Sequence, residues 1–304
     1  MSAVAATSLV CAVLIDAMIG EPPRRIHPVA LLGRWIALVE GQYQHPKVMG
    51  VLILIGGTMV FAGGYAIIGH LAVRLPPLGS ALIIGAALST LLSIRMLTDV
   101  AAAVDDAIQE DLARARRDIR ALVGRDTSDA NAGDLRSAVL ESLTENLSDG
   151  FVATVLAFTI GASLSPAAGL GAAATVKAVN TYDSMIGYVD RPLGTPAARA
   201  DDLLQLIPSR LTALLLAVTT GRFRMLTDGR VWVHAKRPAS PNSGWPMATY
   251  AAVSGVTLHK EGAYRLDPAD ADTSPDAAAV GTAIGHIRRT AVIATAICVV
   301  ILWF

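Results

Sequence analysis

Residues 48–68, VMGVLILIGGTMVFAGGYAII, decide the fold class of this chain of 304 residues. The segment has no Asp, Glu, Lys, Arg or His, and a helix that rises about 1.5 Å per residue crosses a bilayer with about 20 such residues. The whole chain is 53% hydrophobic and only 16% charged, whereas a soluble domain is about a quarter charged. The composition argues against a soluble enzyme, and we expect a transmembrane helix over residues 48–70.

Apolar segments elsewhere predict further spans. Residues 75–97 form the third span in chain order, which opens at a natural helix start, Pro76-Pro77. Residues 3–19 lack the basic beginning of a secretory signal and are interpreted as a retained first span. Weaker candidates are residues 203–220, which contain Pro208 and Arg210, and residues 286–304. The sequence predicts an all-α integral membrane protein of roughly five transmembrane helices, with residues 1–304 as a single polytopic domain.

Residues 151–176 form a charge-free stretch that can be arranged in two ways. Its middle reads GASLSPAAG at residues 161–169, which is a poor place for an unbroken helix. One alternative is a long kinked span, and the other is a re-entrant hairpin of two half-length helices. Non-helical backbone at membrane depth must be buried in protein or line a wet cavity, so the hairpin alternative predicts a cavity here.

The basic residues predict the orientation, because cytoplasmic loops carry the excess of Lys and Arg. They are dense after the first and third spans, whereas the short loop after the second holds only Arg74. We therefore expect residues 20–47, 98–150 and 221–285 to be cytoplasmic in a multi-pass protein of the cell (plasma) membrane. Residues 99–124 predict an amphipathic cytoplasmic helix. Basic and acidic residues balance at 25 each, so nothing indicates a nucleic-acid partner.

Residues 141–150, ESLTENLSDG, place Glu141, Glu145 and Asp149 on neighbouring parts of one helix face. Like carboxylates four residues apart repel each other and destabilise a helix. A Mg²⁺ ion is a natural reason for such a cost, because it prefers carboxylate oxygens. The competing interpretation is a solvated face at the membrane boundary.

A second polar block, KAVNTYDSMIGY at residues 177–188, follows the apolar stretch directly. Lys177, Asn180 and Ser184 share one helical face, and polar groups at the membrane margin favour a functional site. Snorkelling of Lys177 to the interface is the structural alternative. Farther on, Arg210 lies in apolar sequence, and residues 240–246, SPNSGWP, predict a rigid loop. Residues 231–234 and 263–266 predict short strands.

These motifs resemble those of the CbiB/CobD family of cobalamin biosynthesis. The matching blocks stand in family order: Asp16 with GEP at 20–22 and HPV at 27–29; VGRDT at 123–127; Glu141-Ser142, Glu145-Asn146 and Asp149-Gly150; the block from Lys177 to Tyr188; Ala198-Arg199, Asp201-Asp202, Pro208 and Arg210-Leu211-Thr212; and SPNSG at 240–244. The blocks around Asn180 and Asn242 are the most specific. Tyr182 stands where the family pattern has Leu, and Thr154 where it has Pro.

The resemblance implies an inner-membrane ligase that joins the carboxylate of (adenosyl)cobyric acid, a corrinoid, to aminopropanol or aminopropanol phosphate, with ATP as co-substrate and Mg²⁺. The chain has no G-x-x-x-x-G-K-[ST] loop to cradle a nucleotide. On this basis Glu141, Glu145 and Asp149 are the candidate metal ligands. The candidate catalytic residues are Asp183, Lys177, Arg199 and Arg210. The candidate substrate-binding residues are His27, Asn146, Asn180, Ser184, Asp201, Asp202 and Asn242.

Two other functions remain open. A transporter of a corrinoid or another anion can also use a broken helix around a midplane site, but the sequence has no internal repeat. A non-catalytic membrane scaffold for other cobalamin-pathway enzymes explains the cytoplasmic segments but not the clustered carboxylates.

Overall fold

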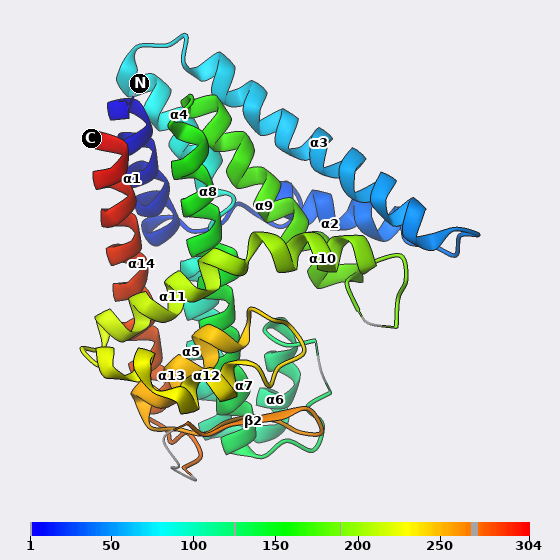
Figure 1. Ribbon diagram of the computed structural model, residues 1–304, viewed down its shortest axis with the longest axis vertical. Coiled ribbons are helices and arrows are strands. Elements are labelled where there is room, and N and C mark those ends of the chain that lie inside the picture. Colours follow the sequence, from blue (N-terminus) through cyan, green and yellow to red (C-terminus); the bar gives the residue numbers. More distant parts are fainter. Residues whose placement is uncertain (1, 125, 189, 269–272) are drawn as a thin grey trace. The chain divides into compact units, whose positions relative to one another are not determined.

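The computed structural model describes residues 2–124, 126–188, 190–268 and 273–304 (Figure 1). The chain divides into two compact units, and neither is continuous in sequence. Unit 1 comprises Met1–Ser93, Ala153–Gln205 and Ala294–Phe304, and unit 2 comprises Ile94–Val152 and Leu206–Ile293. Each unit is described by itself.

Unit 1 is helical throughout its described part. Four of its helices begin at a proline, a residue whose fixed φ suits the first helical position: α2, α3, α4 and α9. The helices are α1 (Ser2–Met18), α2 (Pro28–Val39), α3 (Pro46–Ala72), α4 (Pro77–Ser89), α8 (Ala153–Ala162), α9 (Pro166–Ile186) and α10 (Thr195–Leu204), with the last part of α14 (Ala279–Trp303).

Three helical segments are long and apolar enough to cross a membrane: α3, the run Pro77–Glu110, and α14. A fourth is added if α10 and α11 (Leu206–Thr219), which bend by 47° at a short break, count as one broken span. These candidate spans include the segments predicted at residues 48–70 and 75–97 and at the C-terminal end. The first predicted span corresponds to α1, which is apolar but has only 17 residues. The finding is thus three to four candidate spans, where the sequence predicted roughly five.

The apolar stretch at residues 151–176 breaks after α8 and folds back as α9 (Figure 1). Glycines let the two helices approach closely. A Cβ on Gly161 would lie 2.6 Å from the main-chain oxygen of Ala168, and one on Gly169 would lie 2.8 Å from that of Phe158. Ser165 caps α9 by accepting a hydrogen bond from the Ala168 amide at 3.1 Å. The structure therefore has α8 and α9 as an antiparallel helical hairpin, in which α9 has 21 residues and is longer than a half-length helix. Re-entry of this hairpin into the membrane stays a prediction.

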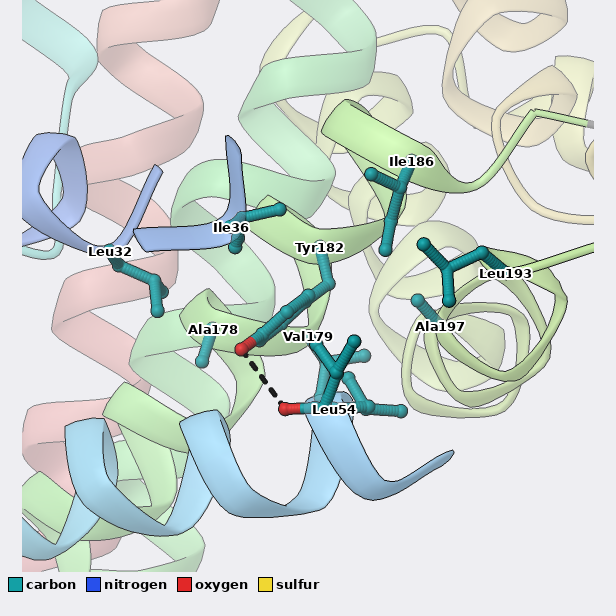
Figure 2. Close-up of a cluster of buried hydrophobic side chains, with 10 residues drawn as sticks. Leu32, Ile36, Leu54, Ala178, Val179, Tyr182, Ile186, Leu193 and Ala197 are labelled. Atoms are coloured by element: carbon teal, nitrogen blue, oxygen red, sulfur yellow. Dashed lines mark hydrogen bonds between the residues drawn. The ribbon is translucent and has the colours of Figure 1, made fainter. Parts of the chain in front are cut away.

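A buried cluster fixes the polar half of α9 against α2 and α3 (Figure 2). At its centre Tyr182 is fully buried, and its hydroxyl donates a hydrogen bond to the main-chain oxygen of Ile53 at 3.2 Å. The edge of the Trp35 ring faces Tyr182, with the ring centroids 6.1 Å apart. Gly57 leaves room for this arrangement, because a Cβ there would lie 1.9 Å from the Tyr182 hydroxyl oxygen.

Unit 2 combines helices with a two-stranded antiparallel hairpin. Its elements are α5 (Ile94–Glu110), α6 (Leu112–Asp118), η1 (Ile119–Ala121), α7 (Ala132–Asn146), the π-helical segment η2 (Leu147–Val152), α11, η3 (Phe223–Thr227), α12 (Gly229–Ala235), α13 (Gly244–Ser254), β1 (Leu258–Lys260), β2 (Tyr264–Leu266) and most of α14. The strand predicted at residues 231–234 is wrong, because these residues belong to α12. The one predicted at residues 263–266 is confirmed as β2.

The amphipathic helix predicted at residues 99–124 forms as α5 and α6, which are separated at Asp111. The Asp111 side chain caps α6 by accepting hydrogen bonds from two main-chain amides. Inside unit 2, Asp105 of α5 is bound at 2.8 Å by the guanidinium of Arg136, and both side chains are buried. An aspartate held in this way acts as a structural link between α5 and α7.

Candidate functional site

The polar half of α9 in unit 1 brings together several of the predicted site residues. Lys177 lies near the loop between α1 and α2, where its charge acts on Glu21 and His27. His27 Nε2 lies 3.5 Å from Glu21 Oε2. Burial lowers the pKa of His27, and the Lys177 charge lowers it further. Burial raises the pKa of Glu21 more than Lys177 lowers it. A neutral imidazole in this place fits a role in binding or orienting substrate.

Asp183 lies on α9 one turn beyond Asn180 and faces α10. Burial raises the pKa of Asp183 to about 6, and the nearby negative charge of Asp202 adds to the shift. A carboxyl group with such a pKa is ionised at neutral pH and still accepts a proton readily, which is what a general base needs. The positive charge of Arg199 does not neutralise the Asp183 carboxylate. Its side chain is 82% exposed, and its nearest guanidinium nitrogen is 3.9 Å from Asp202 Oδ2.

Asp201 and Gln205 form a buried polar pair at the end of α10. Asp201 is 8% exposed and Gln205 only 1%. The amides of Asn180 and Gln205 face the Asp201 carboxyl group. However, Asp201 Oδ1 and both polar atoms of the Gln205 amide lack hydrogen-bond geometry with any described residue. The sequence analysis missed Gln205, although an uncharged amide between Leu203-Leu204 and Leu206-Ile207 is a polar signal in apolar surroundings.

Ser184 stands apart from this group. Its side chain is exposed, and its hydroxyl donates back to the main-chain oxygen of Asn180 at 2.8 Å. Within unit 1, therefore, α9 and α10 gather Asn180, Asp183, Asp201 and Asp202, while Lys177 lies toward His27. Ser184 and Arg199 lie at the outer surface.

The acidic run of unit 2 lies on α7 and η2. Glu141 is buried, and its two carboxylate oxygens accept hydrogen bonds from Ser137 Oγ at 2.9 Å and from the Tyr264 hydroxyl at 2.7 Å. Asn146 is exposed and donates from Nδ2 back to the main-chain oxygen of Ser142 at 3.0 Å. Asp149 lies in the π-helical segment, a distortion that occurs frequently at functional sites.

This arrangement does not support a magnesium site made of all three carboxylates. Within residues 2–124, 126–188, 190–268 and 273–304, the acidic, histidine and cysteine side chains form no group of three or more that could hold a metal ion. Both oxygens of Glu141 already accept hydrogen bonds, one from Ser137 within α7 and one from Tyr264 that joins α7 to β2. The metal-ligand role of Glu141, Glu145 and Asp149 therefore stays a prediction.

Arg210 and Asn242, which the sequence separates by 32 positions, meet in unit 2. Arg210 Nη1 donates to Asn242 Oδ1 at 2.7 Å, and Nη2 donates to the main-chain oxygen of Pro241 at 3.3 Å. The guanidinium also lies over the Trp245 ring, 4.9 Å from its centroid. Such a planar, stacked fork is specific to arginine. Arg210 thus holds residues 240–243 of the predicted loop in place. The loop prediction is wrong for residues 244–246, which form the first turn of α13.

Comparison with known proteins agrees with these motifs. A family model described as CobD/Cbib protein matches residues 9–294. The chain is 36% identical over 274 residues to a probable cobalamin biosynthesis protein CobD of Methanothermobacter thermautotrophicus, covering 86% of this chain and 87% of the relative. It is 33% identical to a protein of the same description from Methanothrix thermoacetophila, covering 97% and 96% of the two chains. No solved structure matches it. The chain therefore belongs to the CobD/CbiB family of cobalamin biosynthesis proteins.

Proposed function

We propose that this protein forms the amide bond between the carboxylate of a cobyric-acid corrinoid and the amino group of aminopropanol or its phosphate, at the cell membrane. The observation that carries the proposal is the polar half of α9. There the half-buried Asp183, with its pKa of about 6, lies on the same helix as Lys177 and beside the acidic end of α10. Family membership supports a role in cobalamin biosynthesis, and the resemblance of the motifs supports this reaction within it.

The chemistry assigns Asp183 its task. An aliphatic amine is protonated at neutral pH, so one proton must leave its nitrogen before the lone pair attacks the carboxyl carbon. An ionised Asp183 carboxylate accepts that proton as general base. The new C–N bond replaces a C–O bond of the carboxyl group, and the oxygen departs with its electron pair. The positive charge of Lys177 stabilises the anionic groups that approach α9.

The remaining candidate residues position the substrates. The neutral His27 imidazole and the Asn180 amide offer hydrogen bonds to a corrinoid rich in amide and carboxylate groups. Arg210 orients Asn242 through the contact at 2.7 Å. The resemblance assigns activation of the carboxylate to ATP and Mg²⁺. The chain lacks a phosphate-cradling glycine loop, so scattered side chains would have to bind the nucleotide.

Reconstitution tests this proposal directly. Purified full-length protein in lipid nanodiscs is supplied with cobyric acid, 1-amino-2-propanol or its O-phosphate, ATP and Mg²⁺, and the amide product is measured by mass spectrometry. Wild type should form the product, and Asp183→Ala or Glu145→Ala should abolish it while leaving the protein in the membrane. Asp106→Asn, which alters an exposed carboxylate of α5, is the control. Normal turnover in both alanine variants would overturn the assignment. Movement of corrinoid across a sealed vesicle without product would favour a transporter.

A further inference from the structure

The end of α10 in unit 1 carries two buried polar side chains, Asp201 and Gln205, that interact only weakly with each other and leave much of their hydrogen-bonding capacity unsatisfied. Asp201 Oδ1 and the whole Gln205 amide lack hydrogen-bond geometry with any described residue, although the two side chains are 8% and 1% exposed. An unpaired polar group inside a protein costs free energy, and an unpaired carboxylate costs more. Two such groups on adjacent turns indicate a ligand that is absent from the structure.

The charges around the pair indicate the sign of that ligand. Asp183 and Asp202 both act electrostatically on Asp201, so three carboxyl groups converge at this place. The guanidinium of Arg199 is mostly exposed and lies 3.9 Å from Asp202, and the groups that act on Asp201 itself are carboxyl groups and neutral amides. Repulsion keeps an anionic group away from these carboxyl groups themselves, whereas a small cationic group relieves both the repulsion and the missing hydrogen bonds.

The side-chain amides of Asn180 and Gln205 indicate which kind of cation fits here. Asn180 and Gln205 both face Asp201, and a primary amide both donates and accepts hydrogen bonds. A bare metal ion would use only the oxygens, and no group of three or more metal-ligating side chains is gathered within the described residues. A primary ammonium donates to carboxylates and amide oxygens, and an oxygen on the neighbouring carbon can accept from an amide nitrogen.

We propose that Asp201 and Gln205, with Asn180 and Asp183, form the subsite that receives the primary ammonium of the amino-alcohol donor. This inference rests on the proposed function for the identity of the donor. It adds Gln205 to the site and assigns the α10 end to the amine rather than to the corrinoid. In this arrangement Asp201 holds the ammonium while Asp183, on the facing turn of α9, takes its proton.

Binding without turnover tests the subsite. Isothermal titration of full-length protein in nanodiscs, without ATP or corrinoid, uses 1-amino-2-propanol, its O-phosphate, and 1,2-propanediol, which lacks the nitrogen. We expect both amines to bind and the diol not to bind. Asp201→Asn should weaken amine binding by about tenfold or more, because it removes a charge-assisted hydrogen bond. Gln205→Leu should weaken it less. Asp106→Asn is again the control.

The outcomes separate this inference from the proposed function. If wild type binds the amines but forms no amide, the proposed function fails and the subsite stands. If Asp201→Asn and Gln205→Leu both bind the amines as wild type does, or if the diol binds equally well, the subsite is overturned. In turnover assays the subsite requires a raised KM for the amine in Gln205→Leu, and a change in kcat alone would contradict it. Asn and Leu are close in size to the residues they replace, and elution as a monodisperse peak on size exclusion checks their folding.

Discussion

Tyr182 shows how one residue and its neighbours depend on each other. The family pattern has Leu at this place, yet the larger tyrosine is fully buried and bonds to the main chain of α3. It fits because Gly57 has no Cβ. Because Tyr182 lies on α9 between Lys177 and Asp183, the contact also holds the polar half of that helix against α3.

We predict that Gly57→Ala destabilises the protein by about 1–3 kcal/mol, the usual range for overpacking. The added Cβ would lie 1.9 Å from the Tyr182 hydroxyl oxygen and 2.6 Å from the Trp35 ring. The neighbouring Gly56→Ala is the matched control, because no described atom lies within 4 Å of a Cβ there. Thermal unfolding in detergent compares the two variants. Tyr182→Leu should restore part of the stability of Gly57→Ala. Equal melting temperatures for both alanine variants would contradict the packing argument.

The pKa of Asp183 predicts how amide formation depends on pH. A general base works only when ionised, so the rate should fall as the pH drops through about 6. Asp183→Asn should lose activity at every pH. The measurement is a pH profile of kcat/KM, which reports the ionising groups of the free enzyme, with Asp106→Asn as control. An acidic limb that stays near the ordinary carboxyl value of 3.8 would show that Asp183 is not the base.

The same pKa has a consequence for stability. Folding raises the pKa of Asp183 from 3.8 to about 6, so the folded state binds this proton more tightly than the unfolded state does. The resulting stabilisation is fully present below about pH 4 and is lost as the pH rises through about 6. Asp183→Asn should therefore be at least as stable as wild type at pH 8, as measured by unfolding at several pH values. A marked loss of stability at that pH would indicate a structural role.

At the scale of elements, the hairpin of α8 and α9 determines where the polar block lies. Small residues let the two helices approach closely, as is usual between helices in membranes. We predict that Gly169→Val separates them, because even a Cβ would lie 2.8 Å from the main-chain oxygen of Phe158. The variant should lose about 2 kcal/mol or more of stability and lose amide formation in parallel. Gly64→Val on α3 is the control, since no described atom lies within 4 Å of a Cβ there. Unfolding curves of both variants check the prediction, and a Gly169→Val protein as stable as wild type would refute it.

The sequence predicted the long helices better than it predicted the irregular and short segments between them. Apolar length located the helices at residues 48–70 and 75–97, and the glycines and Pro166 located the break between α8 and α9. The π-helical segment at Leu147–Val152 was not foreseeable, because one extra residue per turn leaves no mark on hydrophobic periodicity. Residues 231–234 were misassigned, since a short apolar run fits a strand and a helix turn equally well.

The candidate site was predictable by residue type more than by geometry. Polar residues in apolar surroundings pointed to Lys177, Asn180 and Asp183, and the structure gathers Asn180 and Asp183 with Asp201 and Asp202. Spacing alone could not show that Glu141 accepts a hydrogen bond from the distant Tyr264 or that the Arg210 guanidinium stacks on Trp245. Such partners come from tertiary packing, which a single sequence does not encode at any fixed interval.

For the whole molecule, the proposed function requires the blocks around Asn146 and Ser184 to be reached from the same side of the membrane. Both side chains are exposed. In a background with Cys11 and Cys298 replaced by Ala, we predict that Asn146→Cys and Ser184→Cys both react with a membrane-impermeant maleimide from the cytoplasmic side. Labelling in right-side-out and inverted vesicles measures this, with detergent-solubilised protein as the full-reaction control. Labelling from opposite sides would mean that the two blocks do not serve one site.

The chain enters and leaves the two compact units repeatedly, with junctions after residues 93, 152, 205 and 293. A truncation at one position therefore cannot isolate either unit, and a minimal catalytic fragment cannot be obtained by shortening the polypeptide. On the ribosome unit 2 stays unfinished until residue 293 has been made, and unit 1 until residues 294–304 follow, so a nascent chain must be kept from aggregating for nearly the whole of its synthesis. Circular permutants and co-expressed fragments that respect these four junctions are the practical way to take the protein apart.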